Sequence, residues 1–180
     1  MIDITRNRRF KLRNAEVDFK NLVNESVRQL SRLEGAHRLE VKTLIEGLIP
    51  FYNDPDQLQV IFNNLISNAI KFQHAHEVKP KLEIVISIDA SKAIISFHDN
   101  GIGIAKDEMG KVFDMFYRAQ GTKADGSGLG LYIVKELTRK LKGRIYVESL
   151  PGQGSKFVIE LPNKIDPDVV RKLSKLIQNS

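Results

Sequence analysis

The stretch DPDQLQVIFNNLISNAIKF, residues 54–72, combines the start signal of a helix with a continuous apolar face. Asp54 is a preferred N-cap residue, and Pro55 suits the first helical turn because that turn does not need its N–H group. Apolar side chains recur at helical spacing, at Leu58, Ile61, Phe62, Leu65, Ile66, Ala69 and Phe72. The stretch therefore predicts a long amphipathic helix with one buried face.

The opposite side of this helix carries Asn64, Asn68 and Lys71, at positions i, i+4 and i+7. Side chains at this spacing project from one stripe of the helix. Because asparagine is a weak helix former, the presence of two asparagines in this stripe suggests that they have a function. An amide oxygen suits a Mg²⁺ ion that already bridges phosphates, and a lysine complements phosphate charge. A solvated polar face explains the same three residues, so the stripe alone decides nothing.

The remaining elements fit one α+β domain. The pattern predicts a helix within residues 15–33 after a short extended segment, and a strand through residues 39–45. Further on it predicts a hairpin of residues 82–88 and 93–98, a helix over 131–141, strands at 144–149 and 156–161, and a last amphipathic helix opened by Asp166-Pro167. Strands and helices do not alternate regularly, which favours a sandwich with helices on one face of a sheet.

The composition of the 180 residues is that of a soluble globular chain, with 42% hydrophobic and 28% charged residues. The chain contains no cysteine, which excludes disulfides and thiolate metal sites. No stretch approaches the roughly 18 apolar residues of a membrane span, and the first residues lack the apolar core of a signal peptide. We therefore expect a cytoplasmic protein, or the cytosolic part of a membrane-bound receptor, without direct membrane contact of its own.

The formal net charge of +6 is concentrated at the two ends. Residues 1–13 contain five basic side chains and one aspartate, and residues 164–180 contain four basic and two acidic side chains. A nucleic-acid site would need aromatic residues interleaved with the basic ones, and the first run offers only Phe10. We therefore expect no nucleic-acid partner.

Two glycine-rich runs carry further chemistry. Residues 99–104, DNGIGI, follow a predicted strand, where a carboxylate can accept from an exocyclic amine such as that of adenine. Residues 126–131, GSGLGL, lead into a helix, where clustered backbone N–H groups bind anions. An ordinary turn and a flexible hinge are the alternatives, and neither run matches the P-loop or the dinucleotide fingerprint.

The order of these motifs resembles that of the catalytic and ATP-binding (HATPase_c) domain of two-component sensor histidine kinases, in the GHKL ATPase superfamily. Residues 64–72 are similar to the N box, 99–104 to the first glycine box and 126–131 to the second. Between these boxes, residues 112–118, VFDMFYR, resemble the F box. The run GQGSKF at 152–157 is similar to the last glycine motif, with Ser155 where threonine is usual. The resemblance covers residues 15–163.

The resemblance implies a two-layer α/β sandwich, a mixed sheet of about five strands backed by three helices, to which the tail helix is an addition. It implies that Asn68 coordinates Mg²⁺, that Asn64, Lys71 and Arg118 act on the phosphates as catalytic residues, and that Asp99 binds the adenine amine of ATP. The other nucleotide-binding positions that it implies are Gly101, Gly103, Ile104, Phe113, Gly126, Ser127, Gly128, Leu129, Gly130 and Ser155. Residues 105–127 would form a lid over the nucleotide, anchored by Phe113 and Phe116.

The activity implied is transfer of the ATP γ-phosphoryl group to a histidine on a dimerisation domain. None of the chain's histidines, at positions 37, 74, 76 and 98, lies in the sequence context of that acceptor. We therefore expect residues 1–14 to be the remnant of an upstream dimerisation helix, residues 164–180 to be a C-terminal helix or linker, and the chain to be a monomer. A response regulator or receiver domain would be its partner in signalling.

Two other functions stay open at this point. One is a nucleotide-dependent regulatory module of the same superfamily that sequesters a partner and phosphorylates nothing. The other is a serine kinase of that superfamily, which would leave an acid-stable phosphoprotein.

Overall fold

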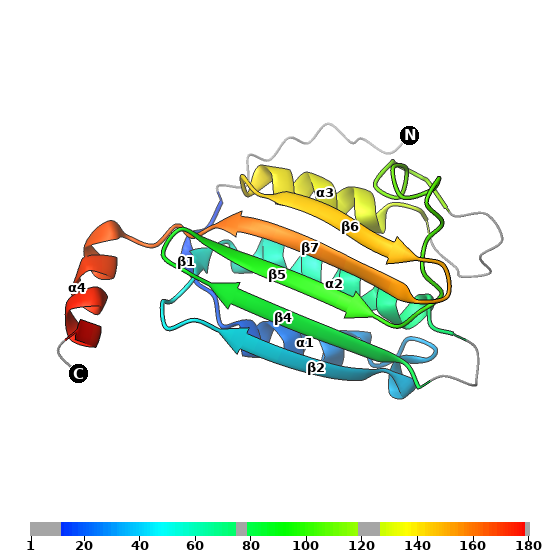
Figure 1. Cartoon of the computed structure of the whole chain (residues 1–180), viewed down its shortest axis with the longest axis horizontal. Coiled ribbons are helices and arrows are strands. Elements are labelled where there is room, and N and C mark those ends of the chain that lie inside the picture. The colour runs from blue at the N-terminus through cyan, green and yellow to red at the C-terminus, as the bar shows by residue number, and fades with distance from the viewer. Residues whose placement is uncertain (1–11, 75–78, 119–126, 179–180) are drawn as a thin grey trace.

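Five strands form one mixed sheet in a computed structural model that describes residues 12–74, 79–118 and 127–178. In spatial order they are β2 (Glu40–Glu46), β4 (Lys81–Ile88), β5 (Lys92–Asp99), β7 (Gly154–Pro162) and β6 (Arg144–Leu150). The β2–β4 pair is parallel, and the other three pairs are antiparallel. Three helices, α1 (Phe19–Leu30), α2 (Pro55–Lys71) and α3 (Gly130–Lys140), lie on one face of the sheet (Figure 1). The predicted two-layer sandwich is confirmed.

The smaller elements lie around this sandwich. Two short strands, β1 (Ala15–Glu16) and β3 (Tyr52–Asn53), pair antiparallel with each other, and a single 3₁₀ turn, η1, spans Ala36–Arg38. The predicted tail helix is α4 (Pro167–Gln178), which projects beyond one end of the sheet (Figure 1). No helix in the described part of the chain is long and apolar enough to cross a membrane.

The predicted N-cap of α2 is confirmed, and so is its apolar face with one correction. Phe72, which the sequence places on this face, is the half-buried C-cap residue because the helix ends at Lys71, and Ile70 is buried instead. The Asp54 carboxylate accepts from the backbone N–H groups of Asp56 and Gln57, each at 3.1 Å. The apolar face packs against the sheet, where its buried members are Leu58, Ile61, Phe62, Leu65, Ile66, Ala69 and Ile70. The Phe62 ring is wholly buried and meets Phe97 of β5 edge to face, with ring centroids 4.9 Å apart. This face fixes the rotation of α2 about its own axis.

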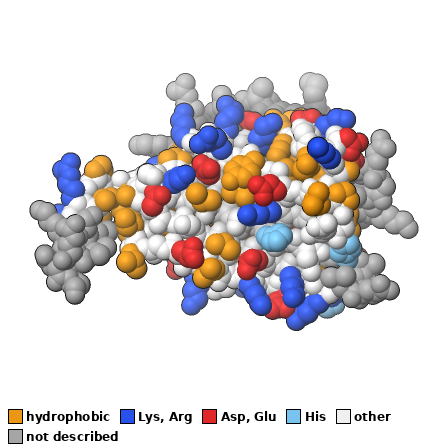
Figure 2. All heavy atoms as spheres, viewed as in Figure 1, with side chains coloured by type: hydrophobic (Ala, Val, Ile, Leu, Met, Phe, Trp, Pro, Cys, Tyr) orange, Lys and Arg blue, Asp and Glu red, His pale blue; other side chains and the backbone are white. Residues whose placement is uncertain are grey.

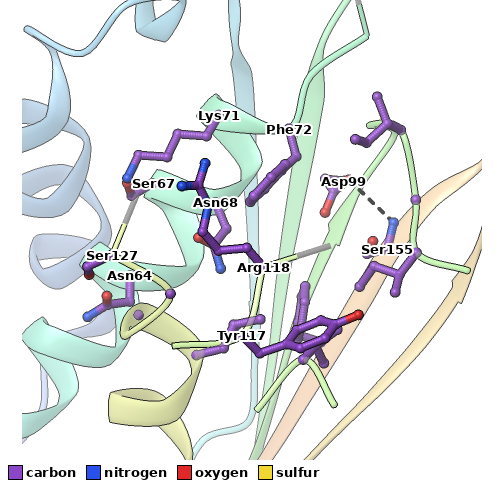
Figure 3. A pocket seen from close by; sticks show the side chains of 18 residues that line it. Asn64, Ser67, Asn68, Lys71, Phe72, Asp99, Tyr117, Arg118, Ser127 and Ser155 are labelled. Carbon is purple, nitrogen blue, oxygen red and sulfur yellow. Dashed lines mark hydrogen bonds between the residues drawn. The ribbon is translucent and has the colours of Figure 1, made fainter. Parts of the chain in front are cut away.

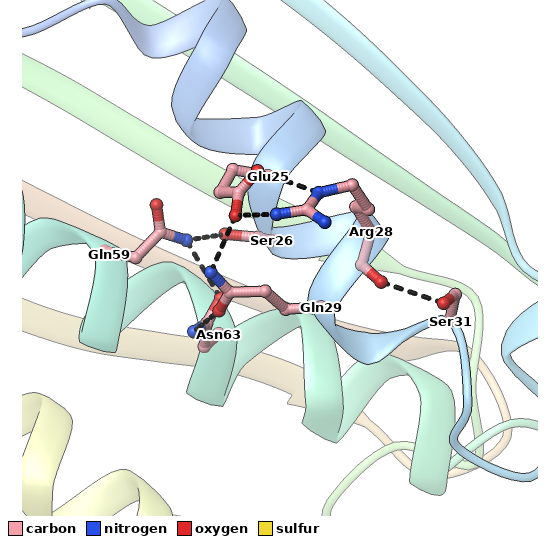
Figure 4. Close-up of polar contacts among 7 residues, drawn as sticks. All are labelled: Glu25, Ser26, Arg28, Gln29, Ser31, Gln59 and Asn63. Atoms are coloured by element: carbon pink, nitrogen blue, oxygen red, sulfur yellow. Dashed lines mark hydrogen bonds and ion pairs between the residues drawn. The ribbon is translucent and has the colours of Figure 1, made fainter.

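A polar seam joins α1 and α2 at the edge of their contact (Figure 4). Gln59 donates to the buried Ser26 hydroxyl at 2.6 Å and to the Asn63 amide oxygen at 3.0 Å. Asn63 in turn donates to Gln29 at 2.8 Å, and Gln29 donates to Glu25 at 3.0 Å. Because the seam satisfies these groups in pairs, it adds directional contacts to an otherwise apolar helix interface.

The other face of the sheet carries no helix from the described part of the chain, and charged side chains lie across it (Figure 1). One row across the five strands reads Lys42, Glu83, His98, Lys156 and Glu148, so charges of both signs lie next to one another. Figure 2 shows this face, with hydrophobic side chains scattered among the charged ones. Such a mixed surface is typical of the exposed side of a sheet.

The chain enters and leaves the sandwich at one place, beside the start of α2. The backbone N–H of Arg13 donates to the Asp54 carboxylate at 2.9 Å, and the Asn14 amide donates to the Lys164 carbonyl at 3.1 Å. The Lys164 ammonium donates to the Asn53 side chain at 3.1 Å, and burial lowers the pKa of this lysine. The segments on either side of the domain are therefore held together.

The packing of Phe62 gives a prediction about stability. Phe62→Ala should lower the free energy of unfolding by about 3–5 kcal/mol, because it removes a large buried ring and leaves a cavity between α2 and β5. Urea unfolding followed by circular dichroism measures this difference. The control is Val60→Ala on the same helix, where the side chain is 40% exposed and the change should stay within about 0.5 kcal/mol. Equal losses in both variants would contradict the proposed anchoring of α2.

Candidate functional site

A cavity of about 230 Å³ lies at the end of the sandwich where α2 and β5 finish. Its walls come from α2, from the loop after β5, from residues 112–118, from the start of α3 and from β7. The lining residues are Asn64, Ser67, Asn68, Lys71, Phe72, Asp99, Ile102, Gly103, Ile104, Val112, Tyr117, Arg118, Ser127, Gly128, Gly130, Leu131, Ser155 and Phe157. The cavity therefore brings together residues from every predicted motif.

The helical wall of the cavity is the predicted polar stripe of α2. Asn64, Asn68 and Lys71 lie along it with Ser67, and Figure 3 shows all four on the same side of the cavity. The Asn64 amide nitrogen donates to the Val60 carbonyl at 2.8 Å, so its oxygen is turned toward the start of α3. Because the opposite face of α2 is buried in the core, this stripe has no other direction to face.

The Asp99 carboxylate lies at the opposite side of the cavity, at the end of β5 (Figure 3). Its Oδ1 accepts from the backbone N–H of Gly101 at 2.8 Å and from that of Ser155 at 3.3 Å. Burial raises the pKa of Asp99, and these two hydrogen bonds lower it by less. Among the described residues only Oδ1 is engaged, so Oδ2 can accept from a ligand.

Close backbone packing beside Asp99 requires glycine. A Cβ atom at Gly154, where φ is +92°, would collide with the Asp99 carbonyl oxygen, and one at Gly101 would collide with the Phe72 carbonyl oxygen. Side chains at either position would push the strand end and the loop apart. These glycines therefore shape the Asp99 end of the cavity.

The start of α3 forms an anion-binding end of the cavity. The N-cap residue, Leu129, gives no side-chain hydrogen bond to the helix, so the first N–H groups of α3 are left for a ligand. Gly130 lets α3 approach α2 closely, since a Cβ there would lie 2.9 Å from the Asn64 amide oxygen. Ser127, Gly128 and Gly130 line the cavity as predicted, whereas Leu129 does not and Gly126 lies outside the described residues.

Residues 112–118 close the cavity from a third side. Tyr117 and Arg118 line it, and the Tyr117 hydroxyl donates to the Glu108 carboxylate at 3.1 Å. Phe113 does not line the cavity. Its ring packs edge to face against the Phe157 ring, with the ring centroids 6.4 Å apart, and this contact anchors the segment. The expectation that Phe116 is a second anchor is wrong. That residue is 66% exposed, with a positive φ of 63°.

Some of the predicted site residues do not line the cavity, and some residues that line it are absent from the prediction. Gly101, Phe113 and Leu129 are predicted but do not line the cavity. Gly101 donates to the Asp99 carboxylate, Phe113 packs against Phe157, and Leu129 is the N-cap residue of α3. The lining residues absent from the prediction are Ser67, Phe72, Ile102, Val112, Tyr117, Leu131 and Phe157. Most are neighbours of predicted residues along α2 or the loops, and alternation along β7 places Phe157 on the same face as Ser155.

The described histidines belong to no group of side chains that could form a metal centre. His74 makes a 3.3 Å contact with the Gly152 carbonyl, and His98 lies on the solvated sheet face. His76 lies outside the described residues. Within residues 12–74, 79–118 and 127–178, no group of three or more His, Cys, Asp or Glu side chains could hold a metal ion.

Comparison with known proteins gives consistent similarities. Residues 53–165 match the family described as histidine kinase-, DNA gyrase B-, and HSP90-like ATPases. Over 157 residues the chain is 32% identical to the sensor protein kinase WalK of Staphylococcus epidermidis, a match that covers 84% of this chain and 25% of WalK. The chain thus spans about a quarter of the length of this curated relative.

Two solved structures extend the similarity to the fold. Full-length ShkA in complex with AMPPNP superposes with a TM-score of 0.70 at 28% identity, covering 87% of this chain and 33% of ShkA. The Acinetobacter baumannii histidine kinase AdeS superposes with a TM-score of 0.70 at 25% identity, covering 88% of this chain and 72% of that one.

The raised pKa of Asp99 gives a prediction about stability and pH. Burial penalises the charged form, so Asp99→Asn should unfold at a higher urea concentration than the wild type at pH 7. The advantage should shrink as the pH falls through the raised pKa of the folded protein. It should vanish below the ordinary pKa of an aspartate, where both states of the wild type are protonated. Urea midpoints across pH 3–8 test this, and a less stable variant at pH 7 would contradict it.

Proposed function

We infer that this chain, which belongs to the family of histidine kinase-, DNA gyrase B- and HSP90-like ATPases, is the ATP-binding catalytic domain of a sensor histidine kinase. The observation that carries the inference is the chemical polarity of the cavity. One end offers a half-buried carboxylate, Asp99, and the other offers helix N–H groups with the cations Lys71 and Arg118. A nucleotide has the complementary ends, an amine on the base and a run of anionic phosphates.

The base would occupy the Asp99 end. Asp99 Oδ2 would accept from the exocyclic amine of adenine, while Gly101 and Ser155 hold Oδ1 in place. Apolar side chains of Ile102, Ile104 and Phe157 line the same region of the cavity and can cover the faces of the ring.

The phosphates would lie between α2 and the start of α3. Backbone N–H groups of residues 127–131 and the Lys71 ammonium would neutralise their charge, and Arg118 is the further cation at this end. The stripe of Asn64 and Asn68 offers neutral amide oxygens, which fit a Mg²⁺ ion that takes its other ligands from phosphates and water. That ion, when bound, would supply charge neutralisation at the phosphates.

Phosphoryl transfer needs little covalent work from the protein, because positioning and charge neutralisation supply most of the catalysis. In this proposal Asn64, Lys71 and Arg118, which line the cavity, would do this at the γ-phosphate. The acceptor we propose is a histidine on a separate dimerisation domain, with a response regulator or receiver domain as the later partner. WalK is named as a sensor protein kinase and AdeS as a histidine kinase, which supports this assignment.

Adenine recognition is tested by calorimetric titration of ADP with Mg²⁺ into the wild type and Asp99→Asn. Losing one charge-assisted hydrogen bond should weaken binding about tenfold or more. The control is Asp168→Asn, the same change on the exposed helix α4, which should leave the affinity unchanged. Equal affinities for wild type and Asp99→Asn would place the base elsewhere.

Transfer is tested with radiolabelled ATP and a dimerisation domain of a sensor kinase supplied in trans. We expect the label on that domain, lost in acid and retained in base, as for a phosphohistidine. Lys71→Ala should slow the transfer at least tenfold, because it removes a cation from the phosphates. ADP binding without any transfer would favour the regulatory module, and an acid-stable label would favour the serine kinase.

A further inference from the structure

A row of three polar side chains crosses the sheet beside the cavity. Strand register pairs Asp99 of β5 with Ser155 of β7, and Ser155 with Ser149 of β6. All three lie on the helix-facing side, because alternation along each strand places them in phase with the buried residues. Asp99 and Ser155 line the cavity, and Ser149 lies one strand behind them.

The Ser149 hydroxyl has three neighbours at hydrogen-bond distance. The backbone N–H of Ile104 approaches its oxygen at 2.8 Å, the Gly154 carbonyl oxygen lies at 2.7 Å, and the Ser155 hydroxyl lies at 3.0 Å. A serine hydroxyl has one proton to donate and two lone pairs that accept. The Ile104 N–H can only donate, and the Gly154 carbonyl can only accept.

These restrictions assign every proton in the row. Ser149 must give its proton to the Gly154 carbonyl and accept from the Ile104 N–H. Its remaining lone pair can only accept, so Ser155 must donate its own proton to Ser149. The proton of Ser155 is therefore committed away from the cavity, and only lone pairs of its oxygen are left to face a ligand.

The polarity of the cavity edge follows from this assignment. Ser155, which is 6% exposed, offers an acceptor, and Asp99 Oδ2 offers a second one beside it. An amine can donate to such an edge, directly or through a water molecule. A carbonyl oxygen would place its lone pairs against two acceptors, which is unfavourable in a buried site.

We propose that Ser149 is a positioning residue for base selection: by holding the Ser155 hydroxyl as a pure acceptor, it makes the cavity prefer 6-aminopurines to 6-oxopurines. The inference rests on the proposed function, since it takes the Asp99 end of the cavity as the base site. Removing the Ser149 hydroxyl frees the Ser155 proton to rotate toward the cavity. Ser155 can then donate to a 6-oxo group, so the preference for an amine weakens.

Binding of ADP and inosine diphosphate, measured by calorimetry with Mg²⁺, tests this directly. The two nucleotides differ in the base at position 6, where an oxo group replaces the amine, and in the proton that N1 then carries. The wild type should bind ADP more tightly, and Ser149→Ala should reduce the ratio of the two affinities about tenfold. The control is Ser96→Ala, a half-buried strand serine on the other face of the sheet, and its ratio should match the wild type.

A double-mutant cycle shows whether Ser149 acts through Ser155. Ser155→Ala should also lower the ratio, and adding Ser149→Ala to it should lower the ratio no further. Ser149→Thr, which keeps the hydroxyl, should restore the wild-type ratio. Thermal unfolding of each variant confirms that it is folded.

The outcomes separate this inference from the proposed function. Tight ADP binding with an unchanged ratio in Ser149→Ala overturns the positioning role and leaves the nucleotide site standing. If Ser149→Ala binds ADP and inosine diphosphate equally more weakly, the positioning role is also overturned, because Ser149 then only supports the loop that contains Ile104. Additive losses in the double variant also overturn it. Failure of the folded wild type to bind either nucleotide overturns the proposed function, and this inference with it.

Discussion

Burial of one face of α2 against the sheet is the constraint on which the site depends. Seven apolar side chains of α2 lie in the core, so the helix cannot rotate without exposing several of them. The stripe of Asn64, Asn68 and Lys71 is consequently fixed toward the cavity by the burial of the opposite face, and the hydrogen bond from Asn64 to the Val60 carbonyl orients one of its amides. The seam of Gln59 and Asn63 with α1 reinforces the same orientation at the edge of the interface.

The two layers divide the recognition of a nucleotide between them. The helical layer supplies cations, amide oxygens and helix N–H groups, which suit phosphates, and the sheet supplies hydrogen-bond acceptors at the ends of β5 and β7. A ligand that satisfies both must lie across the seam between the layers. In the proposed binding mode the cavity therefore recognises a molecule by its two ends, and residues 112–118 form a third wall.

Much of this architecture could be predicted from the sequence, because local signals agree with the packing. For α2, the N-cap residue Asp54 and the helical spacing of apolar side chains both predict the same helix. For β4 and β5, apolar side chains at alternate positions predict the two strands. Strands of two residues, β1 and β3, are too short to carry a pattern. The resemblance implies that Phe116 is an anchor, but its backbone has a positive φ and its ring is exposed, which one sequence does not reveal. The role of Ser149 depends on register across three strands, which one sequence does not reveal.

The junction beside the start of α2 has a mechanical consequence. Arg13 and Asn14 are tied to Asp54 and Lys164, so the two segments leaving the sandwich part from one point. The 17 residues of α2 run from this point to the cavity, a rigid arm of about 25 Å. A tilt of the domain about this junction would therefore displace the cavity more than the parts of the domain close to the junction.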